Sequence, residues 1–579
     1  MPANLDPLRH SCAHLLAAAV LELWPHAKRT IGPAIEDGFY YDFDFGDTKV
    51  TEEDFPALEA KMRELLPRWD GFAREEVSVD EARVAFADNA YKRELIDEFS
   101  GEGQTLTFYR SGDYVDLCRG GHCERPSEEL THFTLLSVAG AYWRGDEKNK
   151  MLTRIYGTCF PTQTELDAYL VQLEEAKKRD HRKLGKQLGL FTFSPLVGSG
   201  LPLFTAKGAE LRRVLGEFVW SLMKPRGYER VWIPHLAKAD LYKTSGHWDK
   251  FSDDIFHVSS KKTDEQFVLK PMNCPHHTQI YASEPRSYRD LPIRMSEITT
   301  VYRDENTGQL QGLSRVRSIT QDDAHVFCTL EQVKGEAMGM YEIIQKFYGA
   351  FGMPLAIRLS MHDPAHMEKY LGGMELWDRA VGILREFLLE IGQPYGEGVG
   401  EAAFYGPKID FIARDAIGRE WQLATIQVDF NLPERFGLEY TDVDGTKKRP
   451  AMVHRAISGS IERFLSVLIE HYEGAFPFWL APVQVRLATV SDEAVPFAQR
   501  VLAELIDANV RAELDDSSEK VGKKVRASAL QKIPWTVVIG KKEAEGGALT
   551  VNVFGQEEDR TIEPGDFVRE AQKAARFPS

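Results

Sequence analysis

The first 163 residues show a helical pattern followed by strand-like segments. Apolar side chains recur at helical spacing over residues 8–27, which predicts an amphipathic helix. The stretch after it, IGPAIEDGFYYDFDF, combines aromatic strand formers with turn dipeptides, and mixed segments continue to about residue 160. We therefore predict an α+β domain over residues 1–163. Its opening segment carries no basic region ahead of the apolar stretch, so it does not read as a signal peptide.

Three further segments follow along the chain. Residues 164–190 predict a basic linker helix, a candidate for RNA contact although most such charge runs are only solvated faces. Residues 191–478 are long enough for one large domain, which ends at the proline-punctuated FPFWLAP. Beyond it, strand patterns such as VQVRLATV and PWTVVIG alternate with two helical patterns, which predicts a small α/β domain over residues 479–579. The chain as a whole is thus expected to be an α+β multidomain protein.

Composition excludes several classes of protein. Of the 579 residues, 43% are apolar and 27% are charged, which is typical of a globular protein. The net charge of −17 repels nucleic acids, so any RNA contact must come from a local basic patch. No apolar run approaches the length of a membrane span, so we expect no membrane contact. Six cysteines are too few for a disulfide framework, which favours a reducing, cytoplasmic location.

Two sets of histidines and cysteines are candidates for chemistry. His10 and His14 stand one helical turn apart, and a second pair, Cys118 and His122, brackets two glycines. The spacing alone leaves three interpretations open: unrelated polar residues, a tetrahedral zinc site, or a metal-free acid–base site that includes Asp116.

The second set lies in the large domain and has no zinc-finger spacing. Its members are Cys274 in KPMNCPHHTQIY, His325 in QDDAHVFC and His454 in MVHRAISGS. Taken by itself, this set is better interpreted as a buried cysteine and two hydrogen-bonded histidines.

Two other motifs carry arginines suited to phosphate. In RDENTGQLQGLSRVRSITQDD, Arg303 and Arg315 would grip phosphate oxygens from two antiparallel strands, and Glu305 could accept from a purine amino group. The alternative is a hairpin with surface salt bridges. In SGSIERF a small-residue strand end runs into a helix bearing Arg463, a weak signal when alone. Neither a GxxxxGK[ST] loop nor a GxGxxG fingerprint is present, so a nucleotide would be held by arginines and a sheet.

The order of these motifs resembles one enzyme family. RGYERVWIP, PMNCP, RDEN…GLSRVR…TQDDAH, FYGPKIDF, WQLATIQVDF and HRAISGSIERF follow one another as in the threonyl-tRNA synthetases, which are class II aminoacyl-tRNA synthetases. TSGHWDKF and LPIRMSEI match too, and the likeness runs from about residue 8 to the C-terminus. It implies a class II antiparallel-sheet catalytic core, an α+β editing domain and a C-terminal α/β anticodon-binding domain. Many bacterial members carry a further ubiquitin-like domain before the editing domain, and we expect this chain to lack it.

The resemblance implies a zinc ion that selects threonine. An apolar pocket separates threonine from its near-isostere valine by only about 10²-fold, whereas direct ligation of the hydroxyl reaches roughly 10⁴–10⁵. In the family one zinc per catalytic site is held at the positions of Cys274, His325 and His454. The residues implied around the amino acid are Gln321, Asp323, which would hold the hydroxyl, Tyr405 and Gln427.

The resemblance also implies an ATP site with Mg²⁺. Arg303 should contact the α-phosphate and Glu305 the adenine, while Arg315 and Arg463 should hold the outer phosphates. Arg303 and Arg463 are thereby the expected catalytic residues. The pocket would be completed by Lys408, Gln422 and Ile319, the last standing where an aromatic residue commonly stacks on adenine. L-Threonine would be activated as its adenylate and then esterified to tRNA(Thr).

An editing activity follows, because serine keeps the hydroxyl and lacks only one methyl. Such a difference is worth about 1–3 kcal/mol, so a second sieve is needed. By resemblance the first domain hydrolyses Ser-tRNA(Thr), with the residues His10, His14, Lys92, Asp116, Cys118 and His122. The family favours hydrolysis without metal, but a related editing fold in alanyl-tRNA synthetases can hold zinc, so a metal stays open.

The remaining implied contacts concern tRNA and a second copy of the chain. Lys520 to Lys524 and Glu543 are carried over as anticodon-domain contacts, and a homodimer with Pro234 at its interface is expected. Competing readings are a prolyl- or histidyl-tRNA synthetase, which lacks the cysteine–histidine set, a non-catalytic RNA-binding paralogue, and a zinc hydrolase. The last would leave residues 191–579 unexplained.

Overall fold

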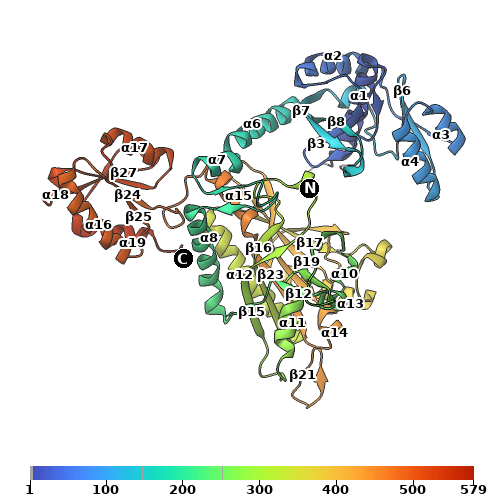
Figure 1. Cartoon of the computed structure of the whole chain (residues 1–579). Helices are drawn as coiled ribbons and strands as arrows, with labels where there is room; N and C mark the ends of the chain where they lie inside the picture. Colours follow the sequence, from blue (N-terminus) through green and yellow to red (C-terminus); the bar gives the residue numbers. More distant parts are fainter. Residues whose placement is uncertain (1–3, 147, 251, 579) are drawn as a thin grey trace. The chain divides into compact units, whose positions relative to one another are not determined.

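The chain forms two compact units, residues 1–174 and 175–579, in a computed structural model that describes residues 4–146, 148–250 and 252–578 (Figure 1). In those residues, no helix combines the length and apolar character that crossing a bilayer requires.

The first unit consists of a long helix against an antiparallel sheet, with a smaller sheet beside it. Helix α1 lies on a sheet of order β1-β3-β8-β7, with β2 paired to β3. A second sheet of order β4-β5-β6 is covered by α3 and α4. The elements run as follows: α1 (Asp6–Leu23), β1 (Lys28–Arg29), β2 (Ala34–Ile35), β3 (Gly38–Asp44), α2 (Phe55–Leu65), β4 (Ala73–Glu76), α3 (Val79–Ala85), α4 (Ala90–Gly101), β5 (Thr107–Ser111), β6 (Tyr114–Leu117), α5 (Pro126–Glu129), β7 (His132–Tyr142) and β8 (Met151–Phe160).

Helix α1 differs from its prediction in length and in burial. It stops at Leu23 rather than at residue 27, because Trp24 precedes Pro25 and a residue before proline is pushed out of the helical region. The expected amphipathic character is also wrong. Almost every side chain from Leu8 to Val20 is buried, because the sheet covers one side of α1 and α2 another. The helix is therefore a core element, and a group on any of its faces is shielded from water.

The second unit is built on an eight-stranded sheet of order β11-β15-β16-β23-β20-β19-β17-β18. Five of its seven strand pairings are antiparallel, and the pairs β11–β15 and β17–β18 at the two edges are parallel. This confirms the predicted class II type of core. The strands are β11 (Glu229–Arg230), β15 (Ile293–Tyr302), β16 (Ser318–Cys328), β17 (Leu355–Met361), β18 (Tyr395–Val399), β19 (Lys408–Arg414), β20 (Glu420–Asp429) and β23 (Ala451–Ser460).

The two faces of this sheet are different. Alternate side chains point to opposite faces of a strand, so Ala324 and Val326 of β16 join the core formed with the helices, as does Val453 of β23. The helices are α8 (Ala206–Met223), α12 (Val333–Phe351), α13 (Met374–Ile391) and α15 (Ile461–His471). The intervening side chains of β16, among them Asp323 and His325, face the other way. That second face carries the polar residues singled out from the sequence.

The C-terminal part has its own core and a five-stranded mixed sheet of order β25-β24-β26-β27-β28. The predicted α/β character is confirmed: the strands predicted at VQVRLATV and PWTVVIG and the two predicted helices are present. Short elements were missed, namely β25, α18 and β28, as was α19. The elements are β24 (Val485–Thr489), α16 (Val495–Asp507), β25 (Ala512–Asp515), α17 (Val521–Leu530), β26 (Trp535–Ile539), α18 (Lys541–Ala544), β27 (Leu549–Val553), β28 (Arg560–Ile562) and α19 (Pro564–Ala574).

The segment predicted as one linker helix consists of two helices. Helix α6 (Gln163–Arg179) ends before Asp180, whose side chain accepts from the backbone N–H of Arg182 and caps α7 (His181–Gln187). An aspartate that caps a new helix breaks a continuous helical pattern without any glycine or proline to announce it. Part of the basic run is already paired, since Arg179 forms a 2.7 Å ion pair with Glu473.

Candidate active sites

The second unit gathers the cysteine and the two histidines that stood far apart in the sequence. The ligand atoms of Cys274, His325 and His454 lie within 4.8 Å of one another, and all three residues are buried. His325 and His454 face each other across the β16–β23 ladder. Cys274 is the first residue of α11 (Cys274–Ala282). Burial raises the pKa of its thiol well above the ordinary value, so a bound metal ion would be needed to hold it as a thiolate. One sulfur and two imidazole nitrogens that converge in a buried place suit tetrahedral zinc with an open position.

Neighbouring side chains orient the two imidazoles. Asp429 accepts from Nε2 of His454 at 2.9 Å, and Nδ1 of His277 lies 2.7 Å from Nδ1 of His325. Hydrogen bonds of this kind decide which ring nitrogen is left for a metal. Burial lowers the pKa of His325 well below its ordinary value, which keeps its ring neutral, as ligation requires. The donor set therefore fits a zinc ion both in its atoms and in its surroundings.

A cavity of about 520 Å³ lies beside this set. Asp323, two residues before His325, accepts from Asn273 through one oxygen, and its other oxygen lies 3.7 Å from Nε2 of His325. Tyr405 donates to Gln427 at 2.7 Å, and both residues line the cavity. The residues of the cavity wall include His247, Met272, Arg303, Phe404, Tyr405, Lys408 and Gln427.

Strand β16 carries four of the predicted residues on one face. Every second position of this strand from 319 to 325 is one of them: Ile319, Gln321, Asp323 and His325. The pairing of β16 with β15 is regular over this stretch, so these side chains share a face. At about 3.3 Å per residue, Ile319 lies about 20 Å from His325 along the strand. The two ends of the strand can thus serve two ends of one extended ligand.

Three arginines lie near the Ile319 end. Arg303 and Arg315 belong to the loop between β15 and β16, which we call the arginine loop (residues 303–317), and Arg463 lies in the first turn of α15. The prediction that two antiparallel strands carry Arg303 and Arg315 is therefore wrong, because both residues lie in the loop between the strands. Burial, and then the charge of Arg315, lowers the pKa of both Arg303 and Arg463. Cations held so close repel one another, and a polyanion relieves this repulsion.

The other predicted nucleotide contacts are partly engaged within the protein. Glu305 forms a 2.7 Å ion pair with Arg315. Lys408 lies 3.0 Å from Asp410, and Gln422 accepts from Arg358 at 2.8 Å. A ligand in this place must therefore compete with internal hydrogen bonds or extend them.

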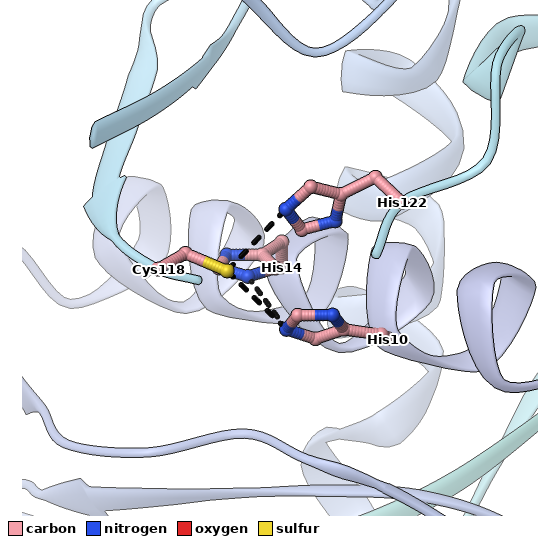
Figure 2. Close-up of side chains that lie close together, drawn as sticks. All are labelled: His10, His14, Cys118 and His122. Atoms are coloured by element: carbon pink, nitrogen blue, oxygen red, sulfur yellow. Dashed lines mark hydrogen bonds between the residues drawn. The ribbon is translucent and has the colours of Figure 1, made fainter. Parts of the chain in front are cut away.

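The first unit likewise brings the pair His10 and His14 together with the pair Cys118 and His122 (Figure 2). Sγ of Cys118 lies 3.6 Å from Nε2 of His10 and 3.4 Å from Nε2 of His122. The Nε2 atoms of His10 and His14 are 3.2 Å apart. The loop after Cys118 turns through Gly120 and Gly121, whose φ angles of 98° and 82° suit glycine. The interpretation as unrelated polar residues is thereby excluded.

A buried carboxylate supports this cluster. Asp116 accepts from Tyr41 at 2.6 Å, pairs with Lys92 at 2.7 Å and lies 3.7 Å from Nδ1 of His14. Burial by itself would raise the pKa of Asp116, but the charges of Lys92 and Arg29 outweigh it, and the pKa lies well below the ordinary value. The predicted assistants Lys92 and Asp116 are thus a charged pair behind His14.

The cluster itself is neutral. Burial lowers the pKa of His10 and His14, and it lowers that of His122 to about 3. Burial also raises the pKa of the Cys118 thiol to about 11. Neutral imidazoles can accept a proton from water or ligate a metal, so both chemistries predicted for this cluster remain possible.

The anticodon-domain residues differ in their accessibility. Lys520 is exposed at the start of α17, whereas Lys524 is buried and donates to the carbonyl oxygens of Thr489 and Asp515. The expectation that the helix from Lys520 to Lys524 faces tRNA is therefore wrong for Lys524. One carboxylate oxygen of Glu543 accepts from the N–H of Gly540, and its side chain is only partly exposed.

Two residues were not singled out from the sequence. His247 lines the cavity, with Nε2 3.8 Å from Sγ of Cys274 and Nδ1 2.8 Å from Oγ of Ser245. The motif TSGHWDKF contains it and could have pointed to it. Arg358 donates to both Gln422 and Asp410, and no sequence pattern marked it.

Family models match three parts of the chain. Residues 256–472 match the tRNA synthetase class II core domain (G, H, P, S and T), and residues 484–574 match an anticodon binding domain. Residues 106–156 match the threonyl and alanyl tRNA synthetase second additional domain. This segment holds Asp116, Cys118 and His122 of the first unit.

Relatives of similar length match almost the whole chain. A threonine–tRNA ligase of Rubrobacter xylanophilus is 50% identical over 97% of this chain and 87% of its own, and one of Gloeobacter violaceus is 49% identical over 97% and 91%. A solved structure described as the RNA binding domain of threonyl-tRNA synthetase from Cryptosporidium parvum Iowa II has a TM-score of 0.66 at 35% identity, covering 69% of this chain and 99% of that one. With these identities over nearly its full length, the chain belongs to the threonine–tRNA ligase family of class II aminoacyl-tRNA synthetases.

Proposed function

We propose that this chain activates L-threonine with ATP, transfers it to tRNA(Thr) and hydrolyses Ser-tRNA(Thr). The observation that carries the proposal is the buried set of Cys274, His325 and His454 beside Asp323. His247, whose Nε2 lies 3.8 Å from Sγ of Cys274, lines a cavity together with Arg303. Prolyl- and histidyl-tRNA synthetases lack this set, and a purely RNA-binding protein has no use for the arginines. A zinc hydrolase would leave the second unit unexplained.

Threonine is held in this proposal by the face of β16 and its neighbours. Cys274, His325 and His454 would hold zinc, which would act as a Lewis acid toward the amine and hydroxyl of threonine. Asp323 accepts a hydrogen bond from the threonine hydroxyl. Gln321, Tyr405 and Gln427 enclose the rest of the amino acid. Asn273 keeps the Asp323 carboxylate in place through its 2.9 Å hydrogen bond.

ATP lies toward the Ile319 end of the sheet. A carboxylate oxygen of threonine attacks the α-phosphorus, the bond to the β-phosphate oxygen breaks, and pyrophosphate leaves with Mg²⁺. Arg303 contacts the α-phosphate, while Arg315 and Arg463 hold the outer phosphates and Glu305 the adenine. Lys408, Gln422 and Ile319 line the same place. Positioning and neutralisation of developing charge supply most of the catalysis.

Editing takes place in the first unit. A water molecule attacks the seryl ester carbonyl, a neutral imidazole of His10, His14 or His122 takes its proton, and the tRNA ribose oxygen leaves with a proton. Cys118 shapes the place of attack, and Lys92 with Asp116 orients His14. Metal-free hydrolysis is the form we propose, because the family resemblance favours it, and the three neutral imidazoles are able to act as bases without a metal.

The remaining assignments concern domains, RNA and oligomeric state. We propose an editing domain over 1–163, a linker over 164–190, a catalytic domain over 191–478 and an anticodon-binding domain over 479–579, with Lys520 and Glu543 contacting tRNA. We propose a cytoplasmic homodimer. Trp232, 77% exposed, and Leu236 flank Pro234 and leave apolar surface that a second copy can cover. The six free cysteines agree with a reducing compartment.

Amino-acid-dependent ATP–pyrophosphate exchange tests the whole assignment. Threonine should support exchange strongly, serine weakly and valine barely, because only the first two offer a hydroxyl for direct ligation. Exchange that proline or histidine stimulates best would overturn the specificity.

Zinc content tests the proposed ligand set. The variant Cys274→Ala should lower bound zinc from about one to near zero per chain, measured by mass spectrometry after dialysis, since a site with two remaining protein ligands binds weakly. The matched control is Cys328→Ala, which removes another buried cysteine on the opposite face of β16. Equal zinc in both variants would contradict the assignment.

Editing is tested at α1. His10→Ala should leave threonylation unchanged and let Ser-tRNA(Thr) accumulate, with a loss of roughly 10²-fold or more in deacylation rate for a general base. His26→Ala, an exposed histidine of the same unit, is the control and should edit normally. Undiminished clearance of Ser-tRNA(Thr) by the His10 variant would remove this residue from the role.

The pH profile of editing should reflect the lowered histidine pKa values. A group that must be neutral to act stays active down to its folded pKa. With the pKa of His122 lowered to about 3, deacylation by this ring, corrected for the His122→Ala background, should be flat from pH 7.5 to 5.5. A base with the ordinary pKa of about 6.5 would lose about ten-fold at pH 5.5. A decline with its midpoint near 6.5 would show that these rings are not the base.

A further inference from the structure

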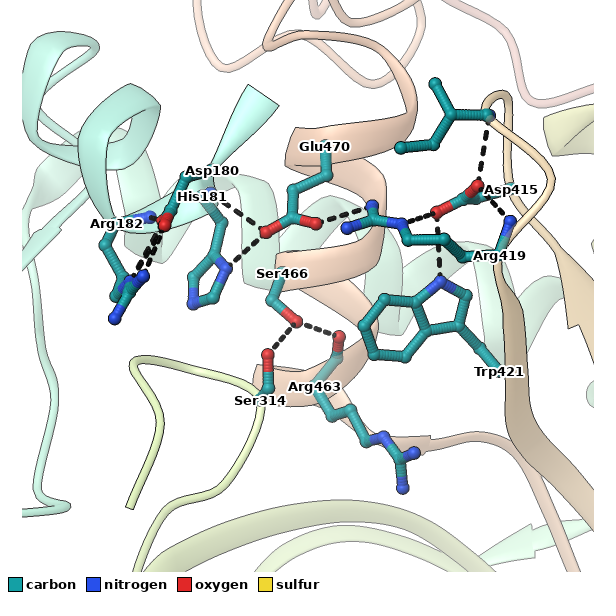
Figure 3. A network of polar contacts seen from close by, with 11 residues as sticks. Asp180, His181, Arg182, Ser314, Asp415, Arg419, Trp421, Arg463, Ser466 and Glu470 are labelled. Atoms are coloured by element: carbon teal, nitrogen blue, oxygen red, sulfur yellow. Dashed lines mark hydrogen bonds and ion pairs between the residues drawn. The ribbon is translucent and has the colours of Figure 1, made fainter. Parts of the chain in front are cut away.

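A buried histidine of helix α7 joins the arginine loop to helix α15 (Figure 3). Nδ1 of His181 lies 2.6 Å from Oε1 of Glu470 on α15, and the same oxygen accepts the backbone N–H of His181 at 3.0 Å. On the other side of the ring, Nε2 lies 3.0 Å from the backbone N of Leu313 in the arginine loop. His181 is 3% exposed and Glu470 is 7% exposed. One ring thus spans two parts of the nucleotide end of the site.

The hydrogen bonds determine the tautomer of this ring. The N–H of Leu313 can only donate, so Nε2 must accept and carries no proton. The proton then stays on Nδ1 and is donated to Glu470. A neutral ring in one tautomer is therefore the form that satisfies both partners, and neither contact can be kept if the ring turns over.

The contact between loop and ring is close. Gly312, next to Leu313, has a φ of +50°, and a Cβ on it would lie 2.3 Å from Nε2 of His181. A side chain at this position would push the loop off the ring, so glycine is needed here both for its backbone conformation and for the approach.

Asp180, His181 and Glu470 also resemble a metal site in composition, since their ligand atoms lie within 4.8 Å of one another. The contacts argue otherwise. Asp180 accepts from Arg182, Glu470 lies 2.6 Å from Arg419, and both ring nitrogens of His181 have partners. A cation would have to displace an arginine and a backbone N–H, so this cluster is a hydrogen-bonded joint.

The positions of Arg315 and Arg463, the two proposed phosphate ligands that do not line the cavity, depend on the hydrogen bonds of His181. Leu313 stands two residues before Arg315. Ser314 follows Leu313 in the arginine loop, and its Oγ lies 3.0 Å from Oγ of Ser466 on α15. Ser466 in turn donates to the carbonyl oxygen of Arg463 at 2.7 Å.

The opposite side of α15 is anchored as well. Arg419, which holds the second oxygen of Glu470, pairs with Asp415 at 2.7 Å, and Trp421 donates to the same carboxylate. The guanidinium of Arg463 lies 5.9 Å from the ring centroid of Trp421. The chain of contacts from His181 therefore leads to Arg315 on one side and to Arg463 on the other.

We propose that His181, oriented by Glu470, is a positioning residue that sets the spacing between the arginine loop and Arg463 and so determines how tightly ATP is held. This rests on the proposed function, in which Arg315 and Arg463 bind the outer phosphates. His181 touches no reacting atom and acts through the backbone of Leu313.

Two substitutions separate the two hydrogen bonds of the ring. In His181→Gln the amide oxygen reaches the place of Nε2 and still accepts from Leu313. In His181→Asn the shorter amide reaches only the place of Nδ1, keeps Glu470 and leaves the buried N–H of Leu313 without an acceptor. We expect His181→Asn to raise KM for ATP about ten-fold in pyrophosphate exchange, with KM for threonine changed less than about two-fold. His181→Gln should stay within about three-fold of the unaltered chain for both constants.

Two references make the result decisive. Arg315→Ala should raise KM for ATP. If it does not, both the proposed nucleotide site and this inference are overturned. If Arg315→Ala raises it but His181→Asn and His181→Gln behave alike, or raise both KM values equally, the positioning role alone is overturned.

Should His181→Asn fold poorly in circular dichroism, Ser466→Ala carries the test. It cuts the second hydrogen bond between loop and α15 at a hydroxyl, and we expect about a three-fold rise in KM for ATP alone. An unchanged KM for ATP in Ser466→Ala would then overturn the inference.

Discussion

The pairing between strands β16 and β23 is the constraint on which the catalytic face depends. His325 and His454 are direct partners in this ladder, and a slip of one residue would turn every side chain of one strand to the opposite face. Asp322 holds the register. Its carboxylate accepts from the backbone N–H groups of Ile457 and Ser458 and pairs with Arg455 at 3.1 Å. A buried acid on the helical side of the sheet thereby fixes where His325 and His454, two of the proposed metal ligands, lie on the other side.

The same acid accommodates an irregularity. The register between β16 and β23 shifts between Gln321 and Asp323, and Gly459, in the extra segment of β23, has a φ of +68°. A Cβ there would lie 2.7 Å from the carbonyl oxygen of Leu423. The bulge redirects β23 into α15 and so brings Arg463 to the end of the sheet where the arginine loop lies. His325 and His454, two of the proposed metal ligands, lie on β16 and β23, and Arg463, a proposed phosphate ligand, follows β23 on the far side of this bulge.

The two sites use burial in opposite ways. In the first unit Asp116 is charged and compensated by Lys92 and Arg29, whereas burial keeps the nearby imidazoles and the thiol neutral. Neutral groups suit proton transfer to and from water. In the second unit, burial and then the charge of Arg315 lower the pKa of Arg303 and Arg463, and an anionic ligand would favour their charged forms. Hydrolysis and phosphoryl chemistry thus follow from which charges are already balanced within the protein.

Much of the fold and part of each site were predictable from local patterns. The helical spacing of His10 and His14 and the strand–helix junction at SGSIERF each depend on neighbours in sequence, and each is present. The buried environment of α1 and the break at Asp180 were not predictable. The first depends on a sheet formed by residues far along the chain, and the second on one side chain that caps a new helix.

The sequence by itself determined the family, through the order of its motifs, and the types of residue available for chemistry. Tertiary structure decided which of them meet. Cys274, His325 and His454 are separated by about 50 and 130 residues, and only strand register and the start of α11 bring their ligand atoms within 4.8 Å. Tertiary structure likewise placed Lys524 in the core and gave His181 its two partners. The physical reason is that hydrogen bonds and burial between distant segments depend on packing, which local hydrophobic periodicity does not specify.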